Sequence, residues 1–144
     1  MSPEPTSFHG QCHCGNVEVT FETKLRVEEL RIRACSCSFC RSHGARTTSD
    51  PSGKVKITVH DSSQLIRYRF GLKTADFLVC GRCGVYLGAV MKAGEETYAT
   101  VNTRTFDHAE KITQEPLIVT YEGETEAERK ARREANWTPV AAFD

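Results

Sequence analysis

The chain has 144 residues and a formal net charge of zero, with 39% apolar and 26% charged residues. This is the size and composition of one globular domain with a core of its own. A neutral chain lacks the positive field that recruits nucleic acid, and its apolar runs, such as residues 89–91, are too short to cross a bilayer. The composition therefore argues against nucleic-acid and membrane partners.

Residues 1–9 are predicted to be a flexible leader, because Pro3 and Pro5 discourage regular structure. They lack the basic start and apolar core of a secretory signal peptide. We therefore expect a cytoplasmic protein, in which thiols stay reduced. Clustered cysteines in that compartment bind metal or take part in catalysis more often than they form disulfides.

From residue 10 onward, short segments alternate apolar and polar residues, which is the period of a half-buried β-strand. These segments are residues 17–21, 30–34, 55–59, 66–70, 77–79, 85–91, 98–101 and 117–121. Residues 47–53 have the composition of a loop. Seven or eight short strands separated by turns predict a mainly antiparallel β domain over residues 10–123.

Residues 124–144 are predicted to be a short C-terminal helix and a tail that belong to the same domain. Thr125 and Glu128 have the spacing of a capping box. Two charge pairs with helical spacing support the helix, Glu126–Lys130 and Glu128–Arg132. One face of this helix carries three alanines, Ala127, Ala131 and Ala135.

The basic residues Lys130, Arg132 and Arg133 lie in the half of the helix where cations suit the macrodipole. We interpret them as a solvated helix face rather than as a nucleic-acid footprint. Trp137, which follows the helix, is predicted to anchor the C-terminal segment by packing.

All seven cysteines lie in three short clusters: Cys12 and Cys14; Cys35, Cys37 and Cys40; Cys80 and Cys83. Short pairs such as Cys80-x-x-Cys83 present two thiolates to one metal ion, and two pairs together make a four-sulfur zinc site. A glycine, Gly15 or Gly84, follows each outer pair and permits the turn that such a site needs. The outer pairs therefore predict a structural zinc.

The remaining Cys35, Cys37 and Cys40 supply three ligands, and three protein ligands with an open position are the pattern of a catalytic zinc. The spacing leaves alternatives open. His43 or a more distant histidine can fill the fourth position and close the site. Alternatively, Cys12 and Cys14 can pair with Cys35 and Cys37. Iron can also replace zinc, although redox-silent zinc is favoured. Two zinc ions per chain are expected.

Three thiolates donate strongly and make zinc a weaker Lewis acid than three histidines do, so the site is less suited to generating hydroxide. It suits the binding of an incoming thiol, whose free pKa is about 8.5 and which is mostly protonated at neutral pH. The predicted chemistry is the addition of a thiol to a small electrophile, or its removal.

Four segments carry a resemblance to a known family: GQCHCGNVEV (10–19), ACSCSFCRSHG (34–44), FLVCGRCGVYL (77–87) and YATVNTRTFD (98–107). They resemble the glutathione-dependent formaldehyde-activating enzyme family, which also includes centromere protein V. The resemblance implies a β-tent of coiled antiparallel sheets. It implies a structural zinc on Cys12, Cys14, Cys80 and Cys83, and a catalytic zinc on Cys35, Cys37 and Cys40.

The activity implied is that of a carbon–sulfur lyase, the condensation of glutathione with formaldehyde to S-(hydroxymethyl)glutathione. Glutathione sulfur would take the open position beside Cys35, Cys37 and Cys40, and the electrophile would be formaldehyde or another small molecule. Arg41 is a candidate for neutralising a glutathione carboxylate or the developing oxyanion, and is equally consistent with a solvated side chain. His43 is a candidate proton shuttle, although a loop histidine of no special role is favoured.

A different class of function is a non-catalytic, zinc-stabilised protein-binding module, and a homo-oligomer is possible in either case. A protein ligand in the fourth position of the three-cysteine site would favour the binding module, and a free position would favour the enzyme. A nucleic-acid or cytoskeletal role lacks the basic extension that it would need.

Overall fold

The structure, a computed structural model, describes residues 6–144. Its strands are β1 (Thr6–Gln11), β2 (Val17–Thr23), β3 (Arg33–Cys35), β4 (Thr47–Thr48), β5 (Lys54–Val59), β6 (Leu65–Tyr68), β7 (Asp76–Cys80), β8 (Tyr86–Ala93), β9 (Glu96–Asn102), β10 (Leu117–Val119) and β11 (Thr138–Phe143). The helices are α1 (Ser38–His43), α2 (Glu126–Asn136) and the short 3-10 segments η1 (Val27–Glu29), η2 (Ser62–Gln64), η3 (Thr103–Thr105) and η4 (Ala109–Lys111). Among the described residues, no helix combines the length and apolar character that crossing a membrane requires.

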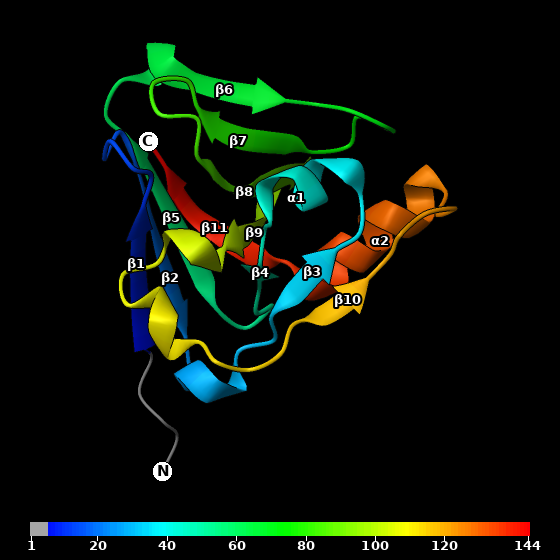
Figure 1. The fold of residues 1–144 in the computed structure, drawn as a ribbon. Coiled ribbons are helices and arrows are strands. Elements are labelled where there is room, and N and C mark those ends of the chain that lie inside the picture. Colours follow the sequence, from blue (N-terminus) through cyan, green and yellow to red (C-terminus); the bar gives the residue numbers. More distant parts are fainter. Residues whose placement is uncertain (1–5) are drawn as a thin grey trace.

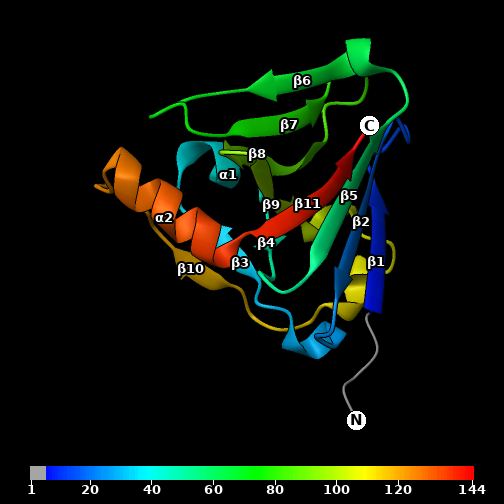
Figure 2. The ribbon, with the colours of Figure 1, turned by 180° about the vertical axis from the view of Figure 1, so that it is seen from behind.

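The prediction of a mainly β fold with one main C-terminal helix is confirmed. All the strands belong to one continuous sheet whose path runs β1-β2-β5-β11-β9-β4-β3-β10, with β6, β7 and β8 branching from β9. Figures 1 and 2 show this sheet bent into walls around an interior. Strands β1, β2 and β5 form one side, the β6–β7 pair crosses one end, and α2 lies with β3 and β10 opposite.

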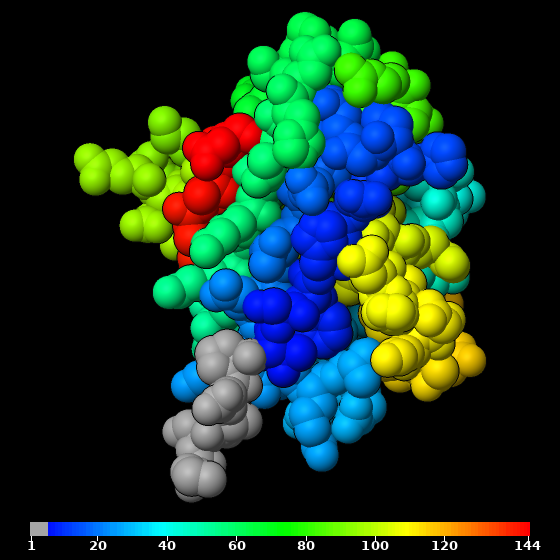
Figure 3. Space-filling model, turned by 90° about the vertical axis from the view of Figure 1, so that its left-hand side faces the viewer, coloured from blue at the N-terminus to red at the C-terminus, as the bar shows by residue number. Residues whose placement is uncertain are grey.

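The alternating pattern of the sequence produces the core. Val17, Val19 and Phe21 of β2 point to one face of the sheet and are at most 2% exposed, while the residues between them face outward. They pair in register with β5, whose Val55 and Ile57 are equally buried. Figure 3 shows β1, β2 and β5 side by side on the outer surface, with residues 103–112 packed along β1.

Several sequence predictions about the strands are wrong in part. The prediction that residues 1–9 form a flexible leader is wrong for residues 6–9, because Thr6–Gln11 pairs antiparallel with β2. Residues 1–5 lie outside the described residues. There are more strands than the seven or eight expected, since the 47–53 loop contains β4 and the predicted tail forms β11. The sheet is mainly antiparallel, as predicted, with two parallel pairings: β10 runs parallel to β3, and β11 runs parallel to β5.

The helix α2 begins as predicted. Thr125 Oγ1 accepts a hydrogen bond from the Glu128 amide at 3.1 Å, and the Glu128 carboxylate accepts one from the Thr125 amide at 3.0 Å. The Glu126–Lys130 pair is present at 3.2 Å. The Glu128–Arg132 pair is not formed; Arg132 binds Glu124 instead.

The interpretation of the basic run as a solvated face is wrong for Arg133, which is 6% exposed, and for the half-buried Arg132. The helix turns this basic side inward and leaves its alanines in solvent. Trp137 is buried among Ala75, Ala89 and Met91, which confirms its role as a packing anchor.

Candidate metal centres and pocket

Two hairpin turns of matching construction bring four cysteines together. Cys12 and Cys14 lie between β1 and β2, while Cys80 ends β7 and Cys83 lies between β7 and β8. Each turn ends in a glycine in the left-handed region, as the sequence predicts. The φ angles are 83° at Gly15 and 82° at Gly84.

Matching backbone hydrogen bonds close both turns. The amides of Cys12 and Cys80 donate to the carbonyls of Val17 and Val85, each five residues ahead and each at 3.0 Å. The sulfurs of the four cysteines all lie within 4.8 Å of one another. The alternative pairing of Cys12 and Cys14 with the triple cluster is therefore wrong.

The sulfur spacing fits a tetrahedral metal. The Sγ atoms of Cys12 and Cys14 are 3.8 Å apart, and those of Cys14 and Cys80 are 3.6 Å apart. Four sulfurs at about 2.3 Å from a tetrahedral zinc would be about 3.8 Å from one another. Burial raises the pKa of the Cys12 thiol to about 11, which disfavours a free thiolate there. A positive ion would reverse that effect, so the cluster can hold a metal.

The second cluster is formed at the junction of β3 and α1. Cys35 ends β3, Cys37 caps α1 and Cys40 lies in its first turn. The Cys40 amide donates a hydrogen bond to the Cys37 sulfur at 3.4 Å. This six-residue helix was not predicted from the sequence, but its first turn is what brings Cys40 back beside Cys35 and Cys37.

Hydrogen bonds within the cluster favour negative charge on Cys37 over Cys40. Hydrogen bonds from the Cys35 and Cys40 thiols, followed by those from the backbone amides of Cys40 and Phe39, lower the pKa of Cys37 far below its usual value. The same contacts with Cys35 and Cys37 raise the pKa of Cys40. The favoured thiolate therefore lies at the start of α1, where free amides stabilise negative charge.

No other histidine, cysteine or carboxylate of residues 6–144 joins this group. The ring of His43 instead packs against Phe39, with centroids 4.6 Å apart, and against Tyr86 at 5.5 Å. The alternative in which His43 closes the site is not what the structure shows. Arg41 is exposed on α1 and does not line the adjoining pocket.

Cys35, Cys37 and Cys40 open onto a cavity of about 410 Å³, a size typical of small-molecule sites. The four-cysteine cluster contributes no residue to this cavity. Aromatic and small apolar side chains from the strands and their flanking segments form part of its lining: Phe70, Ala75, Phe77, Tyr86, Ala89 and Trp137. Burial, with smaller contributions from the three cysteines, raises the pKa of Tyr86 well above its usual value, so its phenol stays neutral.

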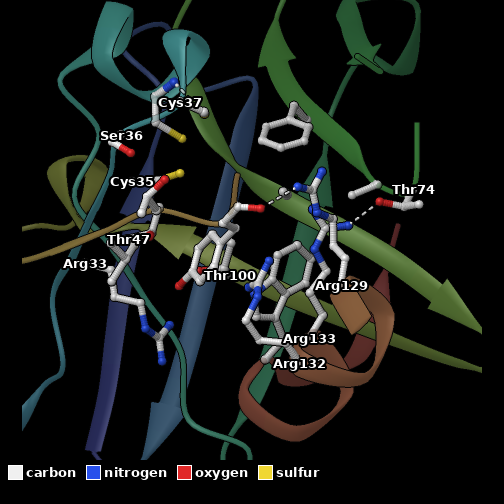
Figure 4. A pocket seen from close by; sticks show the side chains of 18 of the residues that line it. Arg33, Cys35, Ser36, Cys37, Thr47, Thr74, Thr100, Arg129, Arg132 and Arg133 are labelled. Atoms are coloured by element: carbon white, nitrogen blue, oxygen red, sulfur yellow. Dashed lines mark hydrogen bonds between the residues drawn. The ribbon is translucent and has the colours of Figure 1, made fainter. Parts of the chain in front are cut away.

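Four arginines also line the cavity, and the sequence interpretation missed this basic set. Figure 4 shows Cys35 and Cys37 on one side of the pocket and three arginines of α2 across from them, Arg129, Arg132 and Arg133. Arg33 of β3 completes the basic set. The i, i+3, i+4 spacing of the helix arginines is that of a buried helix face and is the sequence signal that could have found them.

Comparisons with known proteins agree with the cysteine pattern. The family model of the glutathione-dependent formaldehyde-activating enzyme matches residues 7–122, which include all seven cysteines and end before α2. No curated protein matches the chain. A solved structure of a Rhodobacter sphaeroides protein is 28% identical, covering 76% of this chain and 98% of that one, with a TM-score of 0.59. Because the family match spans most of its length, this chain belongs to the glutathione-dependent formaldehyde-activating enzyme family.

Proposed function

We propose that the protein is a zinc-dependent carbon–sulfur lyase that joins a thiol of the glutathione type to formaldehyde or another small electrophile. Cys12, Cys14, Cys80 and Cys83 would hold a structural zinc, and Cys35, Cys37 and Cys40 a catalytic one. The observation that carries the proposal is the position of the three-cysteine cluster. It lies on the wall of a ligand-sized cavity, while the four-cysteine cluster lies away from it.

The donor sets support a different role for each cluster. Four thiolates complete the coordination of zinc, as in structural sites, whereas three leave a position that an exogenous ligand can take. A zinc ion on Cys35, Cys37 and Cys40 would supply the charge that keeps a bound thiol deprotonated and nucleophilic. A non-catalytic binding module would not need such a cluster beside a cavity.

The protein's own residues would prepare the reaction in three ways. The amide groups at the start of α1 stabilise negative charge on the sulfur cluster. The apolar wall formed by Phe77 and Tyr86 limits water around the reacting thiol. The neutral phenol of Tyr86, which also lines the cavity, keeps this wall uncharged at physiological pH.

In the proposed reaction the thiol sulfur forms a bond to the carbonyl carbon of formaldehyde. The carbonyl π electron pair moves to oxygen, which takes up one proton, and the thiol releases one. The product is S-(hydroxymethyl)glutathione, and the reverse reaction regenerates thiol and aldehyde. No oxidant or reductant is required. None of the seven cysteines forms a disulfide, and the proposed location is a reducing compartment such as the cytoplasm.

The experiment combines metal analysis with glutathione titration of the wild type and Cys37→Ser. We expect two zinc ions per wild-type chain, one per variant chain, and at least tenfold weaker glutathione binding by the variant. Unchanged glutathione binding after loss of the second metal would refute the catalytic proposal.

A further inference from the structure

Arg133 is a buried cation whose charge has no partner within the described part of the chain. It is 6% exposed, and its Nε is buried without any hydrogen-bond acceptor among residues 6–144. A hydrogen bond holds the group in place: Nη1 donates to Thr74 Oγ1 at 2.7 Å, drawn as a dashed line in Figure 4. The guanidinium also lies over the ring of Trp137, 4.8 Å from its centroid.

The neighbouring charges leave this group uncompensated. Glu124 pairs with both Arg129 and Arg132, at 3.2 Å and 2.8 Å, so its one negative charge is already shared. Glu122 lines the cavity but is exposed and forms no ion pair within residues 6–144. Burial, then the like charges of Arg132 and Arg129, lower the pKa of Arg133 to about 10, which leaves it charged at neutral pH.

An unpaired buried charge is costly, and such groups are ordinarily paired. The cost is explained if the partner is a ligand that enters the cavity. The sequence region beyond residue 122 lies outside the family match, so the family resemblance does not assign a role to this side of the pocket.

We propose that Arg133, held by Thr74, binds a carboxylate of the thiol substrate across the cavity from Cys35, Cys37 and Cys40. This inference rests on the proposed function, because it assumes that the substrate sulfur lies at the three-cysteine cluster. A planar guanidinium with a free Nε matches a carboxylate in a two-point hydrogen bond. The substrate class is therefore a carboxylate-bearing thiol, and neutral thiols of similar size are poor substrates.

The test uses ligands without a free thiol, so that the two ends of the pocket are measured separately. S-methylglutathione keeps both carboxylates, and its diester has neither. Calorimetric titration of the zinc-loaded protein should show binding of S-methylglutathione and at least tenfold weaker binding of the diester. Arg133→Gln should weaken S-methylglutathione binding about 10- to 100-fold, the range for a charged hydrogen bond. The exposed neighbour variant Lys130→Gln is the matched control and should bind as the wild type does.

The outcomes distinguish a failure of the Arg133 carboxylate site from a failure of the proposed function. Equal binding of S-methylglutathione by Arg133→Gln and the wild type, equal binding of the diester by the wild type, or no binding of S-methylglutathione at all would overturn the subsite. Cys37→Ser should weaken glutathione binding and leave S-methylglutathione binding unchanged. If Cys37→Ser binds glutathione normally while Arg133→Gln does not, the proposed function fails and the subsite stands.

Two further measurements guard against a purely structural role. Arg133→Met removes the buried charge and keeps the length of the side chain, so the ligand-free variant should unfold at or above the wild-type temperature and gain no stability from S-methylglutathione. A structural role predicts a clear fall in the unfolding temperature instead. If Arg133→Gln does not fold, Arg133→Lys and the wild-type diester comparison decide the question.

Discussion

The Sγ atoms of Cys14 and Cys80 lie 3.6 Å apart, although they belong to the turns of two separate hairpins. This contact joins the β1–β2 side of the sheet to the β7–β8 side at the end where no strand connects them directly. A metal at this point would replace a missing strand pairing. The connection between these two sides of the fold therefore depends on the four-cysteine cluster and not on the three-cysteine cluster.

Replacing Cys80 by serine should prevent folding. A structural zinc contributes on the order of 10 kcal/mol, which is comparable to the whole stability of a domain. Circular dichroism and metal analysis should show a disordered chain that does not retain two zinc ions. Cys37→Ser is the matched control and should fold with one zinc. A Cys80→Ser protein with wild-type unfolding temperature and metal content would contradict this assignment.

Replacing Arg41 by alanine should change the turnover rate with glutathione and formaldehyde by no more than about twofold, within the range of surface substitutions. The side chain is exposed and lies outside the cavity lining. Steady-state rates of Arg41→Ala and Arg133→Gln, measured together, check this. A loss in Arg41→Ala as large as that in Arg133→Gln would restore the role that the sequence suggested for Arg41.

The interaction of His9 with Asp107 and Glu18 should make the stability of the folded protein depend on pH. A hydrogen bond with Asp107, opposed by burial and supported by Glu18, raises the pKa of His9 above 6.5. Because folding raises this pKa, protonated His9 stabilises the fold fully below pH 6.5. This contribution is lost as the pH rises through the higher pKa of the folded state. The effect should be below about 1 kcal/mol because the group is partly exposed. Chemical denaturation of zinc-loaded wild type and His9→Gln should show a difference at pH 6 that shrinks by pH 9; a difference that grows would contradict the sign.

Removing the cap of α2 should destabilise the protein by about 1 kcal/mol, the usual effect of losing a threonine N-cap. Thr125→Ala deletes the hydroxyl that accepts the Glu128 amide hydrogen bond. Glu126→Ala removes only the surface pair with Lys130 and should cost less than about 0.5 kcal/mol. Equilibrium unfolding in urea distinguishes the two, and equal losses would show that the cap does not hold the helix.

The cysteine clusters could be predicted from the sequence because their determinants are local. Two cysteines a few residues apart, followed by Gly15 or Gly84, specify a turn whose geometry hardly depends on the rest of the fold. The alternation in Val17, Val19 and Phe21 likewise indicates which face of β2 is buried. Local patterns were sufficient for the strands of the core.

The basic side of the pocket could not be predicted in the same way. Helical periodicity shows that Arg129, Arg132 and Arg133 share a side, but whether that side faces water depends on where α2 docks. The ordinary rule that charged helix faces are solvated gave the wrong orientation here. Strand β11 was missed for the same reason, since its pairing with β5 and β9 is fixed by segments far away in the chain.

The central claim is that the three-cysteine cluster catalyses the addition of a thiol to a small aldehyde. It is tested most directly by the rate at which glutathione and formaldehyde equilibrate with S-(hydroxymethyl)glutathione, followed by exchange NMR with zinc-loaded wild type, with Cys37→Ser and without protein. We expect the wild type to accelerate equilibration at least tenfold over the uncatalysed reaction and Cys37→Ser to return it to the background rate. A folded wild type that leaves the rate at background, or a Cys37→Ser variant as active as the wild type, would contradict the account.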